Sequence, residues 1–163
     1  MRMRTILSLL LCCTALFASA QAPSKVRRLD AYLAIRYPGT IPVDDAGNPM
    51  RRGVDSAWTI VAETRTTKMN WGYAWRGGRI YTIAATRVTE LNVGKTKEGG
   101  LPIVRRAAAG NYLWQLELVP FDGHKKAPAR VAAGAILIQG KAGVRPFYRT
   151  LRTYTELDPA PSV

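Results

Sequence analysis

The sequence predicts a mainly β protein: a single antiparallel β-barrel or β-sandwich of about seven to eight strands with one N-terminal α-helix. Two observations support this prediction. Apolar and polar side chains alternate with a period of two through most of the chain after residue 57, as they do in half-buried strands. Glycines and prolines interrupt the alternation at short intervals, which is typical of strands joined by turns.

Residues 1–20 have the three parts of a secretory signal peptide. A short basic start precedes an apolar run over residues 6–17, and Ala18 and Ala20 supply the small side chains that a signal peptidase reads. Cleavage after Ala20 would leave 163 − 20 = 143 residues with a charge of 13 − 2 = +11. Both cysteines would leave with the signal, which excludes thiol catalysis and thiolate–zinc sites in the mature chain.

An amphipathic segment follows the expected cleavage site. Its apolar side chains Val26, Leu29 and Leu33 fall at helical spacing, and a serine before them is a suitable N-cap. The pattern predicts a helix over residues 24–37. A strand over residues 32–37 is the competing interpretation.

The remaining boundaries depend on proline and glycine content. Residues 38–53 are rich in both and are expected to form a connection. We expect the single β-rich domain to extend over residues 21–157. Residues 158–163, which contain two prolines, are expected to form a flexible tail.

The strongest local signal is a β-hairpin with its turn at residues 76–79. Two glycines between alternating segments supply the positive φ angles of a two-residue turn. In that register Trp75 faces Ile80 across the hairpin. The same register puts three aromatic side chains on one side of the hairpin: Trp71, Tyr73 and Trp75.

Alternation predicts further strands after the hairpin. The pattern is clearest between residues 112 and 118, where large apolar side chains alternate with Gln and Glu. The predicted strands are Arg87–Val93, Ile103–Ala107, Asn111–Phe121, Arg130–Gln139 and Phe147–Leu157.

Positive charge is distributed along the whole chain, with 24 Lys and Arg against 11 Asp and Glu. Arginine is the more frequent cation, which suits bidentate binding of phosphate or carboxylate. A solvated basic surface without a specific partner is the alternative. The candidate contacts with an anionic partner are Arg76, Arg79, Arg105, Arg106, His124, Lys125 and Lys126, and the aromatic row Trp71, Tyr73 and Trp75 could stack on a ligand.

These features lead us to expect a non-enzymatic binding protein in the periplasm of a Gram-negative bacterium, or outside the cell. Its partner would be an acidic protein, as for an inhibitor or immunity-type protein, or an anionic envelope glycan or lipid, because a basic surface attracts such molecules over long range. Cytoplasmic nucleic acid is not the expected partner of an exported chain. We expect no metal, no cofactor and no transmembrane helix after signal cleavage.

Two other functions fit the composition. A small secreted ribonuclease-like hydrolase could use His124 with a carboxylate, Glu90 or Glu117, and with arginines around the phosphate. No diagnostic spacing joins these residues. Alternatively, the chain could be a structural component of a bacterial envelope assembly or a small outer-membrane barrel, since its length suits the smallest such barrels.

Overall fold

The computed structural model describes residues 25–36, 44–48 and 55–159. These residues contain ten strands and no helix, so the predicted mainly β character is confirmed. The strands are β1 (Val26–Arg36), β2 (Asp55–Thr64), β3 (Met69–Arg76), β4 (Arg79–Val88), β5 (Glu90–Gly94), β6 (Ile103–Arg106), β7 (Tyr112–Pro120), β8 (Ile136–Ala142), β9 (Arg145–Leu151) and β10 (Thr155–Glu156).

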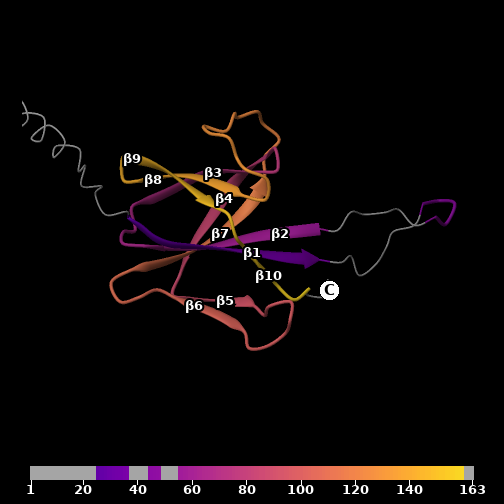
Figure 1. Cartoon of the computed structure of the whole chain (residues 1–163), viewed down its shortest axis with the longest axis horizontal. Coiled ribbons are helices and arrows are strands. Elements are labelled where there is room, and N and C mark those ends of the chain that lie inside the picture. The colour runs from indigo at the N-terminus through magenta and orange to yellow at the C-terminus, as the bar shows by residue number, and fades with distance from the viewer. Residues whose placement is uncertain (1–24, 37–43, 49–54, 160–163) are drawn as a thin grey trace, which may run out of the picture.

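Eight of the strands form one curled sheet, like half a barrel, in the order β10-β1-β2-β7-β4-β3-β8-β9 (Figure 1). All neighbours are antiparallel except β10 and β1. The curl brings the edge strand β9 close to the first half of β1. Its inner face holds the larger core, in which Ile60, Leu116 and Ile138 are fully buried.

The two remaining strands, β5 and β6, form a small separate sheet below β1 and β2 in Figure 1. This small sheet packs on the outer face of the large sheet, and a second apolar cluster lies between the two sheets. The buried residues of this second cluster are Tyr32, Val61, Leu113 and Leu157. Strands β1, β2 and β7 are therefore covered on both faces, whereas the β3–β4 hairpin contributes only the last residue of β4, Val88, to the second cluster.

The predicted helix over residues 24–37 is wrong, because residues 26–36 form strand β1. Leu29 and Leu33 contact the inner core at the alternate positions of a strand, and Tyr32 between them is buried on the opposite face. A register shift between Val26 and Arg28 adds one residue and turns Val26 to the inner face as well. The bulge thus gave the apolar residues of a strand the spacing of a helix.

The other predicted strands agree with the structure to different degrees. The turn at residues 76–79 is present, with Trp75 opposite Ile80. The strand predicted over Arg130–Gln139 begins only at Ile136, because residues 130–135 belong to a long loop. The predicted signal peptide, residues 38–43 and 49–53 of the predicted connection, and residues 160–163 of the tail lie outside the described residues. No described segment is a helix of the length and apolar character that a membrane crossing requires.

Candidate functional site

A concavity of the described surface lies between the β3–β4 turn and the loop after β7, which is the orange loop at the top of Figure 1. It is an open pocket of about 660 Å³. Five of the ten residues predicted as candidate contacts line it: Trp75, Arg76, His124, Lys125 and Lys126. Gly78, Ile80, Gly123, Ala127, Ala129, Arg130 and Val131 complete the lining.

The hairpin turn fixes one wall of the pocket. Gly77 and Gly78 have φ angles of 56° and 77°, the left-handed region that a two-residue turn requires. Arg76 and Arg79 therefore pair directly across the turn. Arg76 lines the pocket, whereas Arg79 is exposed and lies outside the lining.

The predicted aromatic row is wrong at one position, because strand β3 contains a bulge. Its pairing with β8 shifts between Trp71 and Ala74, so these two side chains share the inner core. Tyr73 and Trp75 remain together, with ring centroids 6.2 Å apart. Trp71 instead packs against Phe147 at 5.6 Å and is not available to a ligand.

Tyr73 and Trp75 hold the loop that forms the opposite wall. The indole Nε1 of Trp75 donates a hydrogen bond to the backbone oxygen of Lys125 at 3.0 Å. The Nζ atom of Lys125 lies 3.8 Å from the ring centroid of Tyr73, a cation–π contact. Phe121 packs edge-on against Tyr73, and its backbone N–H donates to Ile80 at 3.1 Å. The aromatic pair is thus a support for the basic loop rather than an exposed stacking surface.

The local fold of this loop depends on a glycine. A Cβ atom on Gly123 would lie 2.5 Å from Cζ of Phe121, closer than packed side chains allow. The chain therefore turns tightly against the Phe121 ring and presents His124, Lys125 and Lys126 to the pocket.

Arg76 is held by an aromatic ring and not by an acid. Its guanidinium carbon lies 4.1 Å from the ring centroid of Trp58, and Trp58 contacts Tyr154 edge-on at 5.0 Å. The Nε atom of Arg76 is buried and has no hydrogen-bond partner among the described residues. Arg76 therefore contributes to the pocket a positive charge that no described carboxylate neutralises.

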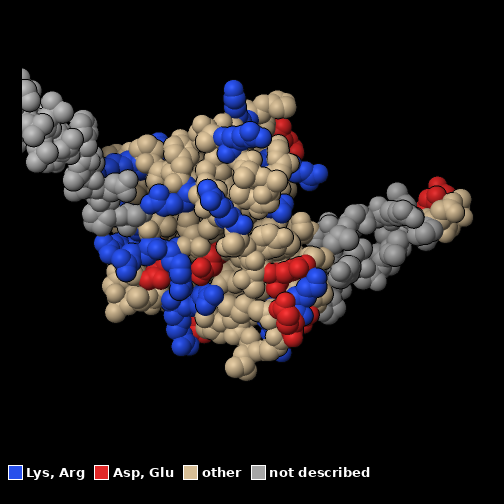
Figure 2. Space-filling view, viewed as in Figure 1, with Lys and Arg blue, Asp and Glu red and all other residues tan. Residues whose placement is uncertain are grey.

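The pocket gathers cations that lack acidic neighbours. Among the described residues, Arg76, Lys125, Lys126 and Arg130 form no salt bridge, and no carboxylate lines the pocket. Figure 2 shows a related division of charge: most red side chains of this face lie over its lower half, and most charged side chains in its upper part are blue. The electrostatic potential of the pocket is therefore positive and suited to an anion.

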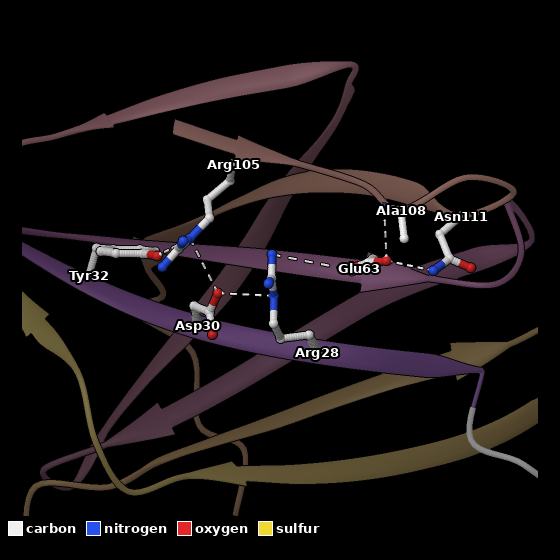
Figure 3. Close-up of polar contacts among 7 residues, drawn as sticks. All are labelled: Arg28, Asp30, Tyr32, Glu63, Arg105, Ala108 and Asn111. Carbon is white, nitrogen blue, oxygen red and sulfur yellow. Dashed lines mark hydrogen bonds and ion pairs between the residues drawn. The ribbon is translucent and has the colours of Figure 1, made fainter. Parts of the chain in front are cut away.

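Arg105 and Arg106 on β6 belong to a different environment, and Figure 3 shows the contacts of Arg105. The Nε atom of Arg105 donates to the hydroxyl of Tyr32 at 2.7 Å and lies 3.5 Å from a carboxylate oxygen of Asp30. Arg106 is paired with Glu90 on the neighbouring strand. Both of these predicted contact residues therefore stabilise the small sheet, and neither of them lines the pocket.

The same network contains the most buried carboxylate. Glu63 accepts hydrogen bonds from the side chain of Asn111 and from the backbone N–H of Ala108, and Arg28 approaches it at 3.9 Å. The Asn111 hydrogen bond is the main cause that lowers the pKa of Glu63 below its ordinary value. Its charge therefore stabilises the loop between β6 and β7.

The hydrolase alternative lacks its expected geometry. His124 is exposed on the pocket rim, but Glu90 is paired with Arg106 in the small sheet. Glu117 lies in β7 and accepts a hydrogen bond from Gln115 at 2.8 Å. Neither carboxylate lines the pocket beside His124. Within the described ranges, no three His, Cys, Asp or Glu side chains gather so that they could hold a metal ion.

Sequence reasoning missed part of the pocket. Arg130 was predicted to begin a strand and was not among the ten candidate contacts, yet it lines the pocket from a loop. Pro128, two residues before it, is a signal for that loop. The stacking of Arg76 on Trp58 had no sequence signal, because it joins residues from strands that are not neighbours in the sheet.

No family model matches this chain, and neither a curated protein nor a solved structure matches it.

Proposed function

We propose that this protein is an exported, non-enzymatic binding protein that holds an anionic envelope polymer in the pocket between the β3–β4 turn and the loop after β7. One observation carries the proposal. The four cations of the pocket have no carboxylate partner among the described residues, whereas Arg28, Lys97, Arg105 and Arg106 do. A cation already paired with an acid adds little to the attraction of a ligand. Other described cations also lack an acid, but these four converge on one concavity, and that convergence marks the site.

The shape of the site favours this partner over a folded acidic protein. A pocket of about 660 Å³ lies in the usual range of small-molecule sites and admits the end or a side group of a polymer. A protein partner would need a contact area of roughly 800 Å² on each side, most of it flat. Export remains part of the proposal and is supported by the composition of residues 1–20.

The test is binding to immobilised lipopolysaccharide, an anionic envelope glycolipid, at increasing NaCl. The test variant is the triple substitution Lys125→Ala, Lys126→Ala and Arg130→Ala. At about 0.5 kcal/mol for each exposed charge, it should weaken binding by roughly tenfold at low salt. The difference from the unaltered protein should shrink as salt increases, because exposed charges are screened.

A matched control removes the same charge elsewhere. Lys68, Lys141 and Arg145 are exposed cations at the other end of the β3–β8 pair, where β3 begins. Their replacement by alanine changes the net charge equally and should leave binding almost unchanged. Equal weakening in both variants would show that only total charge matters, and absence of binding to the unaltered protein at low salt would refute the proposal.

A further inference from the structure

The pocket concentrates more positive charge than a single carboxylate would require. Four cations and the imidazole of His124 line one concavity. A carboxylate has one negative charge and two oxygens, whereas a phosphate monoester has a charge of about −1.5 to −2 at pH 7 and three free oxygens. Several donors arriving from two walls match the phosphate group better.

Arg76 supplies the directional part of such a contact. Its guanidinium is held 4.1 Å from the Trp58 ring centroid, so packing fixes its plane before any ligand arrives. Guanidinium and phosphate form two parallel hydrogen bonds in this geometry. Lysine has the same charge but is a point donor without the planar fork. Lys125 also lines the pocket, where its backbone oxygen is held by Trp75 and its amine by the ring of Tyr73.

The rest of the pocket is apolar and larger than a bare phosphate requires. Ile80 and Val131 contribute partly buried apolar surface, and Ala127 and Ala129 add small side chains. The C–H faces of a sugar ring can pack on such a wall. A volume of about 660 Å³ leaves room for a ring beside the anion.

Resting on the proposed function, we infer that the group recognised is a phosphate monoester on a sugar, with Arg76 as its principal ligand. The charge of the pocket selects the phosphate, and its apolar wall receives the ring. The substrate class is thus a phosphorylated monosaccharide, either free or at the end of an envelope glycan.

Calorimetric titration of the unaltered protein tests the ligand class. The probes are glucose 6-phosphate, glucuronate and glucose, at one ionic strength. We expect glucose 6-phosphate to bind at least tenfold more tightly than glucuronate, which has a similar ring with a carboxylate. Glucose should not bind measurably. A glycan with the same phosphate at its terminus shows which source binds more tightly, and binding of either supports the inference.

The Arg76→Lys variant tests the residue. It retains the charge and loses both the fork and much of the stacking, so we expect glucose 6-phosphate to bind tenfold to a hundredfold more weakly, as for loss of a charge-assisted hydrogen bond. Arg79→Lys is the matched control across the same turn and should bind as the unaltered protein does. A thermal unfolding midpoint for each variant shows whether it is folded.

The binding experiments distinguish failure of the phosphosugar inference from failure of the proposed function. If lipopolysaccharide is retained at low salt but neither glucose 6-phosphate nor the phosphorylated glycan binds more tightly than glucuronate, the phosphosugar inference is overturned and the proposed function stands. If no anionic probe binds the unaltered protein, both fall. Equal binding by Arg76→Lys and the unaltered protein would remove Arg76 from its assigned role.

Discussion

The hydrogen bond between Trp75 and Lys125 is the contact that we expect to control the basic loop. Trp75→Phe keeps an aromatic ring and removes the Nε1 donor, so the backbone oxygen of Lys125 loses its partner at 3.0 Å. A neutral hydrogen bond of this kind contributes about 1 kcal/mol, with a range of roughly 0.5–1.5 kcal/mol. A loss of 1 kcal/mol increases the population of the open loop about fivefold at 25 °C.

Limited proteolysis with trypsin measures that population, because the loop itself contains Lys125 and Lys126. When opening is fast relative to cleavage, the rate of cutting is proportional to the open fraction. We therefore expect the fragments cut after these two lysines to form about fivefold faster in Trp75→Phe than in the unaltered protein. Fragment masses identify the bond that is cut.

Trp114→Phe is a closely matched control. The Nε1 atom of Trp114 donates to the side-chain oxygen of Thr64 at 2.8 Å, so this variant also loses an indole ring and one hydrogen bond. Trp114 packs against the inner core and does not line the pocket. Equal acceleration at Lys125 and Lys126 in both variants, or none in Trp75→Phe, would refute the assignment of Trp75 as the support of the loop.

Two predictions concern the scaffold. Because the pKa of Glu63 is lowered in the folded state, its charge stabilises the fold fully above its ordinary pKa of 4.5. That stabilisation is lost as the pH falls through the lowered folded-state pKa. In Glu63→Gln the free energy of unfolding should therefore depend less on pH below 4.5. Glu156→Gln, which removes the ion pair with Lys97, is the control and should keep the acid dependence of the unaltered protein. Gly140→Ala should lower the free energy of unfolding in urea by about 1–3 kcal/mol, because a Cβ there would lie 2.5 Å from Cζ of Phe147 and 3.0 Å from a backbone oxygen. Gly72→Ala, whose Cβ would lie 3.4 Å from its nearest neighbour, should cost less, and an equal cost would contradict the packing argument.

Local chemistry explains which parts of the fold the sequence could predict. The turn at Gly77 and Gly78 is specified by two adjacent residues, and its predicted register is observed. Strand β1 was predicted as a helix because the pairing with β2 shifts between Val26 and Arg28, and one chain does not reveal where a bulge lies. The same limit applies to Trp71, which a second bulge turned into the core.

The candidate site was predicted as two separate pieces. The hairpin turn around Arg76 and the basic segment at Lys125 and Lys126 are each visible as charge next to turn residues. Their meeting depends on β4 pairing with β7, which brings the end of β7 beside the start of β4 at Tyr81 and Pro120. Such pairing joins distant parts of the chain, so its geometry came only from the structure. The loop position of Arg130 followed from the late start of β8.

The contrast between Arg105 and Arg76 explains why net charge alone does not identify a site. Both lie over an aromatic ring, but Arg105 also has the carboxylate of Asp30 at 3.5 Å, and the two together fasten one strand to another. Arg76 has no such acid among the described residues, and its Nε atom is buried without a partner, which costs about 1–3 kcal/mol. Guanidinium tolerates this position because it is weakly hydrated and its face packs on Trp58. Arg76 therefore contributes to the pocket a positive charge that no described acid neutralises, whereas the charge of Arg105 is already paired with Asp30.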